Sequence, residues 1–222
     1  MTDTQKPKLG RSWQAEEVTI EEIRALTEGF ADAAPLFEDD MVDGAVYDIV
    51  VVDGDLDVDG DLDTFKHGLM GLVVRGSLRV EGLYEDTDDP ACGVFVLGDM
   101  TARRVITTGT LGVAGTLTAT EALIGFYNDY GATIGKDVVT PLFHPENHHF
   151  NIRGSLEAKA VVGHGAEYRV PAALKARVQA LVPKNLREVL VDEVLRGEED
   201  DEIELDDTKL RQRVAKGLPF LR

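Results

Sequence analysis

The hydrophobic and polar positions of the chain follow a short pattern that recurs six times. Each copy reads apolar, any residue, Gly or small, Asp/Ser/Thr, Leu-like, any residue, and small or β-branched. In a strand alternate side chains face opposite sides, so Val74, Leu78 and Val80 can point inward while Arg75 and Arg79 face water. The Gly position predicts a bend of the chain, where the backbone lies too close to a neighbouring coil to allow a larger side chain. The copies span residues 52–58, 74–80, 96–102, 113–119, 134–140 and 152–158.

The spacing of these copies predicts the fold. Their third positions are separated by 22, 22, 17, 21 and 18 residues, which is too short for a helical pair and suits one coil of a parallel β-helix. Lys136 stands where five copies have Gly, so the register of that copy is open. Residues 85–90 predict a polar loop between coils. We expect a mainly β fold, a single-stranded parallel β-helix of about six right-handed coils.

Three segments are expected: an N-terminal arm with one helix (1–45), the β-helix (46–166) and a helical C-terminal segment (167–222). Thr19 and Glu22 form a capping-box pattern for the first helix. Apolar spacing predicts helices over 171–182, 186–195 and 209–216, with an acidic linker at 198–207 and an apolar tail that docks through Leu218, Phe220 and Leu221. Because terminal coils expose strand edges, we expect these helices to pack on or cap the ends of the β-helix.

The valines, leucines and glycines of residues 50–162 resemble bactofilins, the polymer-forming bacterial cytoskeletal proteins built on a right-handed parallel β-helix. The resemblance implies end-to-end polymerisation without nucleotide, at a membrane in some settings. Helical ends would oppose such stacking. Hexapeptide-repeat acyltransferases and carbonic anhydrases have left-handed coils, and only residues 52–62 show a six-residue echo of that kind.

Charge and composition limit the classes of molecule that the protein is expected to bind. The 222 residues carry 41 acidic and 23 basic side chains, a net charge of −18. Nucleic-acid binding needs clustered Lys/Arg, so nucleic acid is excluded as a partner and a basic protein is favoured. No apolar run is long enough for a membrane span, residues 1–10 lack the apolar core of a secretory signal, and the single cysteine, Cys92, excludes an intramolecular disulfide. We expect a cytoplasmic protein.

Four of the five histidines lie within 21 residues: His144, His148, His149 and His164. His144 and His164 are about one coil apart, so with His148 or His149 they could hold zinc or iron in a site resembling that of γ-type carbonic anhydrases. The alternative is a set of solvated or hydrogen-bonded loop histidines, because neighbouring residues of a strand face opposite sides.

A run of alternating aspartates supplies a second metal candidate. Asp55, Asp57 and Asp59 followed by Gly60 match the first half of an EF-hand calcium loop. Lys66 stands where that loop needs a bidentate carboxylate. The alternation with Leu56 and Val58 equally fits a half-buried strand with a solvated acidic face that discourages edge pairing.

The densest aromatic segment is a candidate protein-interaction patch. Phe126, Tyr127, Asp129 and Tyr130 lie at a turn signal and could be exposed, or could fold back onto the β-helix. The sequence around Cys92 does not suggest an activated nucleophile, so we expect a buried or idle thiol. No catalytic Ser-His-Asp elbow, P-loop or dinucleotide fingerprint occurs.

These observations leave three functions open. The first is a non-enzymatic bacterial scaffold or protein-interaction protein, built on a rigid acidic β-helix, that binds a basic partner in the manner of an inhibitor or immunity protein. The second is a bactofilin-like, self-assembling homo-oligomer. The third is a metal-dependent enzyme of the γ-carbonic-anhydrase type at the histidines. We favour a protein without catalytic residues and without a cofactor, zinc or calcium being the alternatives.

Overall fold

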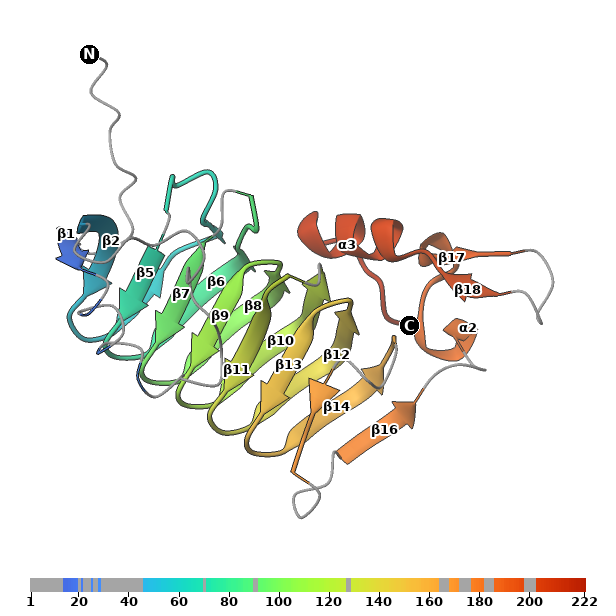
Figure 1. Cartoon of the computed structure of the whole chain (residues 1–222). Helices are drawn as coiled ribbons and strands as arrows, with labels where there is room; N and C mark the ends of the chain where they lie inside the picture. Colours follow the sequence, from blue (N-terminus) through green and yellow to red (C-terminus); the bar gives the residue numbers. More distant parts are fainter. Residues whose placement is uncertain are drawn as a thin grey trace.

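The chain forms a parallel β-solenoid of about six coils, which confirms the predicted fold class (Figure 1). The structure is a computed structural model. It describes residues 14–19, 21, 25, 28, 46–69, 71–89, 92–126, 129–163, 168–171, 177–181, 186–197 and 203–222. Successive coils add strands to two eight-stranded sheets.

The first sheet begins with an antiparallel strand, because β1 pairs with β2 in that sense. All other neighbours in this sheet are parallel. Of the predicted N-terminal helix, Glu21 and Ala25 are helical, and most of its other residues lie outside the described part. In spatial order the strands are β1 (Gln14–Thr19), β2 (Val46–Val52), β5 (Gly71–Val74), β7 (Gly93–Val96), β9 (Thr110–Val113), β11 (Gly131–Ile134), β13 (His149–Ile152) and β15 (Tyr168–Arg169).

The second sheet is parallel and carries the longer strands. Residues 177–181, predicted as helix, instead form its last strand, because the free edge of β14 offers backbone hydrogen-bonding groups. Its strands are β3 (Leu56–Val58) and β4 (Leu62–Asp63), which both pair with β6 (Leu78–Glu85), then β8 (Met100–Thr107), β10 (Leu117–Phe126), β12 (Val138–Glu146), β14 (Leu156–Val161) and β16 (Arg177–Leu181).

The sequence repeat sets the register of both sheets. The first apolar position of every copy stacks on that of the next, from Val52 through Val74 to Ile152. The Leu-like position does the same in the second sheet, from Leu56 through Leu78 to Leu156. All these side chains are buried in one continuous core. Burying each stabilises the fold by about 1.5–3 kcal/mol.

Lys136 does not disturb this register. Its backbone N–H donates to Gly115 O at 3.0 Å, and its carbonyl accepts the N–H of Gly154 at 2.9 Å. The close approach in this copy falls one residue earlier, at Gly135, where a Cβ would collide with the carbonyl oxygen of Ala114. The glycine requirement is therefore met by the neighbour.

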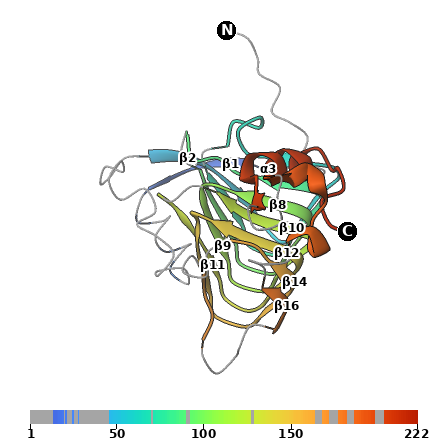
Figure 2. The ribbon, with the colours of Figure 1, turned by 90° about the vertical axis from the view of Figure 1, so that its right-hand side faces the viewer.

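The C-terminal segment packs along the side of the solenoid (Figures 1 and 2). It contains α2 (Leu186–Val189), a 3-10 helix (Asp192–Val194), the antiparallel pair β17 (Leu195–Arg196) and β18 (Glu204–Leu205), and α3 (Asp207–Ala215). The predicted helix over 186–195 is thus limited to two short turns. The expected linker 198–207 is structured from β18 onward, and the predicted helix over 209–216 corresponds to α3.

A second apolar cluster lies between this segment and the outer face of the second sheet. The solenoid contributes outward side chains from five coils, including Leu83, Ile106, Ile124 and Val162. The segment covers them with Leu186, Leu190, Val194, Leu195, Leu210, Val214 and Phe220. Of the predicted docking tail, Phe220 is buried, Leu221 is partly buried and Leu218 is exposed. The segment therefore covers a flank of the solenoid. Among the described helices, none has the length and apolar character needed to cross a membrane.

Candidate functional site

The first coil carries an acidic surface that we call the acidic coil: Asp53, Asp55, Asp57, Asp59 and Asp61, all exposed. Between them Leu56 and Val58 are buried, so the alternation is that of a half-buried strand. Asp53 forms an ion pair with Arg75 Nη1 at 3.1 Å. Within the described part of the chain, the carboxylates of Asp57 and Asp59 have neither a hydrogen bond nor an ion pair. The acidic coil therefore keeps uncompensated negative charge.

The Asp/Ser/Thr position of the repeat joins successive coils at their corners. The carboxylate of Asp55 accepts the N–H of Ser77 at 2.8 Å. Asp99 accepts the N–H of Thr116 at 2.8 Å, and Asp137 accepts that of Ser155 at 2.7 Å. The carboxylate of Asp55, one of the candidate calcium ligands, is thus already used within the solenoid.

The histidines are placed in different surroundings. His144 is buried on the outer face of β12 and contacts α3. His148 is also buried and packs edge-on against Phe150, with ring centroids 5.3 Å apart. His149 lies at the surface, where some loss of hydration and the nearby charge of Arg169 lower its pKa. His164 lies outside the described residues.

One group of metal-ligating side chains does converge in the described part of the chain: His144, Glu146 and Asp207. Each offers one ligand atom, and these atoms lie within 4.8 Å of one another. His144 and Glu146 are two apart on β12 and so share a face, while Asp207 opens α3. The sequence analysis singled out His144 and missed both carboxylates, and no local spacing connects Asp207 with residue 144.

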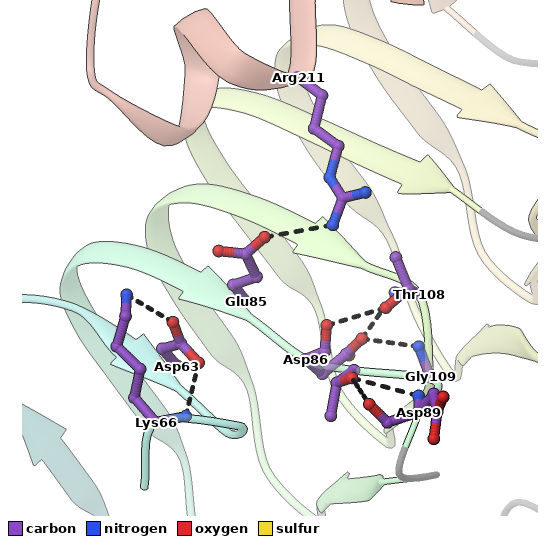
Figure 3. Close-up of polar contacts among 9 residues, drawn as sticks. Asp63, Lys66, Glu85, Asp86, Asp89, Thr108, Gly109 and Arg211 are labelled. Atoms are coloured by element: carbon purple, nitrogen blue, oxygen red, sulfur yellow. Dashed lines mark hydrogen bonds and ion pairs between the residues drawn. The ribbon is translucent and has the colours of Figure 1, made fainter. Parts of the chain in front are cut away.

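Two arginines also hold α3 against the solenoid. Buried Arg104 donates from Nη1 to Val214 O at 2.7 Å, where its charge also favours the C-terminal end of the helix dipole. Arg211 reaches Glu85 at 3.3 Å (Figure 3), and its guanidinium lies 5.0 Å from the ring centroid of Phe126. Phe126 is consequently half-buried beneath α3.

The other residues of the aromatic segment differ in exposure. Asp129 is exposed, Tyr130 is partly buried and Tyr127 lies outside the described residues.

A buried carboxylate, Asp86, was not anticipated because it lies in the stretch predicted as a polar loop. Its Oδ1 accepts the N–H groups of Thr108 (2.6 Å) and Gly109 (2.8 Å), as Figure 3 shows. Its Oδ2 accepts the hydroxyls of Tyr84 (2.9 Å) and Thr107 (2.8 Å). Burial raises the pKa of Asp86, while these hydrogen bonds oppose the rise. Four donors occupy the carboxylate, which therefore acts as a structural link between coils.

Cys92 lies near this carboxylate and is buried, as predicted. Burial, with a smaller effect of Asp86, raises the pKa of its thiol to about 12. Since the thiolate is the nucleophile, this cysteine is chemically inert in the folded protein.

Comparison of the chain with protein-family models, curated proteins and solved structures gave no match.

Proposed function

We propose that this protein is a non-catalytic interaction scaffold that presents the acidic coil to a basic protein partner. The observation that carries this proposal is the exposure of five carboxylates on one coil, with Asp57 and Asp59 unpaired within the described chain. Like charges held this close repel one another, and a cationic surface would relieve that repulsion.

The solenoid supports this proposal because it holds the carboxylates in place. Leu56 and Val58, which flank Asp57, are 1% and 4% exposed, and each is in register with a residue of β6. Positions fixed in advance reduce the ordering cost of binding, and concentrated negative charge steers a basic partner toward the site.

The proposal is tested with a fluorescent octalysine peptide as a basic probe, its binding followed by anisotropy at low and high salt. The double variant Asp57→Asn/Asp59→Asn should bind it several-fold more weakly and with a shallower salt dependence. The matched control, Glu157→Gln/Glu188→Gln, removes two exposed carboxylates elsewhere and should bind more nearly like the unchanged protein. Equal weakening in both double variants would refute a specific role for the acidic coil.

A second candidate function is self-assembly, as in bactofilins, and one observation favours it. The acidic coil lies at one end of the solenoid, whereas exposed Arg153, Lys159 and Arg169 lie in its last coils, together with exposed Glu157. Opposite charge at the two ends would favour head-to-tail contact. The antiparallel β1 interrupts the parallel stacking at the acidic end, so we rank this function second.

A further inference from the structure

The outer face of β12 and the start of α3 meet at a buried imidazole with an unsatisfied nitrogen. His144 is 1% exposed, and its Nδ1 lies 2.7 Å from Val162 O. Because a carbonyl oxygen only accepts hydrogen bonds, Nδ1 must carry the proton and donate it. The neutral ring then has a bare lone pair on Nε2. Among the described residues, Nε2 has no hydrogen-bond partner.

A carboxylate lies beside that nitrogen. His144 Nε2 lies 3.1 Å from Asp207 Oδ1, and Glu146 completes the group of three ligand atoms within 4.8 Å. Two acceptors this close repel each other, and a cation between them, either a proton or a metal ion, would remove the repulsion. A histidine whose other nitrogen donates to a backbone carbonyl is also the usual arrangement of a metal ligand, because that hydrogen bond fixes the tautomer and the ring.

We propose that His144, Glu146 and Asp207 bind a divalent first-row transition metal, with zinc as the type ion. Ligand atoms on a tetrahedral zinc ion lie about 3.3 Å apart for bonds of about 2.0 Å, close to the observed separation of Nε2 and Oδ1. The third ligand, the half-buried Glu146, has a carboxylate oxygen within 4.8 Å of both other ligand atoms. One imidazole and two carboxylates favour such an ion over calcium, which takes six or more oxygen ligands.

The site would join two parts of the chain. His144 and Glu146 belong to the solenoid, whereas Asp207 is the first residue of α3. A bound ion would therefore hold the C-terminal segment on the solenoid flank, in addition to the contacts of Arg104 and Arg211. This inference is independent of the proposed binding of a basic partner, since the acidic coil shares no residue with the metal site.

The test uses the full chain, stripped with a chelator and titrated with Zn²⁺ against a chromophoric competitor, with metal content measured after gel filtration. We expect one zinc ion per chain. Asp207→Asn and Glu146→Gln should each weaken zinc binding at least tenfold, and both are partly exposed sites where folding is retained, as circular dichroism would verify. Cobalt in place of zinc should give intense visible bands that Asp207→Asn abolishes.

Two controls locate the ion. Glu188→Gln changes an exposed carboxylate of the same segment, and Asp57→Asn changes the acidic coil. Neither should alter zinc affinity. The proposal is overturned if less than one equivalent binds, if both ligand variants bind as the unchanged protein does, or if Asp57→Asn removes the ion.

Discussion

Asp55 and Ser77 are 22 residues apart, yet the Asp55 carboxylate accepts the Ser77 backbone N–H at 2.8 Å. The same contact continues from coil to coil, because Ser77 Oγ accepts the N–H of Asp99 at 3.2 Å and Asp99 in turn accepts that of Thr116. The Asp/Ser/Thr position of the repeat thus satisfies backbone donors at the corners, where strand pairing is interrupted.

Replacing Asp137 tests this role most cleanly, because its Oδ1 accepts both the N–H (2.7 Å) and the hydroxyl (2.6 Å) of Ser155. Asp137→Ala should lower the free energy of unfolding by about 1–2 kcal/mol in urea titrations. Asp137→Asn retains an acceptor oxygen and should lose less. Equal stability of Asp137→Ala and the unchanged protein would show that the corner contacts contribute nothing.

Neighbouring residues 135 and 136 offer a matched test of the glycine rule. In Gly135→Ala the new methyl group would collide with the Ala114 carbonyl, so we expect a loss of about 1–3 kcal/mol in the free energy of unfolding. Lys136→Ala changes an exposed residue and should stay within about 0.5 kcal/mol. The reverse order of the two losses, measured by urea unfolding, would contradict the register described for this copy.

Asp86 should influence stability in a pH-dependent way. Its folded-state pKa is raised above the ordinary 3.8, chiefly by burial. Below 3.8 both the folded and the unfolded state are protonated. Between 3.8 and the raised pKa the folded state binds more protons, so the free energy of unfolding falls as pH rises, and above the raised pKa it levels off. Asp86→Asn should lack this fall when urea unfolding is measured from pH 3.5 upward. If the unchanged protein instead gained stability over Asp86→Asn as pH rises, the raised pKa of Asp86 would be contradicted.

The same residue separates loss of charge from loss of hydrogen bonds. In Asp86→Asn the amide oxygen can still accept from Thr108 and Gly109, and the amide nitrogen can donate to the two hydroxyls, so stability near neutral pH should stay within about 1 kcal/mol. Asp86→Ala leaves two buried backbone donors unsatisfied and should cost about 2–5 kcal/mol. Similar losses in both variants would mean that the charge itself is needed.

Short-range patterns predicted the core of the fold, because Val74, Leu78 and Val80 recur with the period of a strand and at the spacing of a coil. These patterns gave wrong or incomplete predictions where contacts between distant parts of the chain determine the structure. Val178 and Leu181 suit a helix face as well as a strand, and the free edge of β14 selects the strand. His144 was conspicuous as one of several clustered histidines. Its partner Asp207 lies far away in sequence, so only the docking of α3 brings the two together.

Sedimentation velocity of the full-length protein over a wide concentration range tests most directly whether it is a scaffold for another protein and not a self-assembling subunit. The antiparallel β1 interrupts parallel stacking at one end of the solenoid, so we predict a small species whose sedimentation coefficient does not change with concentration. Growth into long species as concentration rises would contradict the scaffold and establish self-assembly in its place.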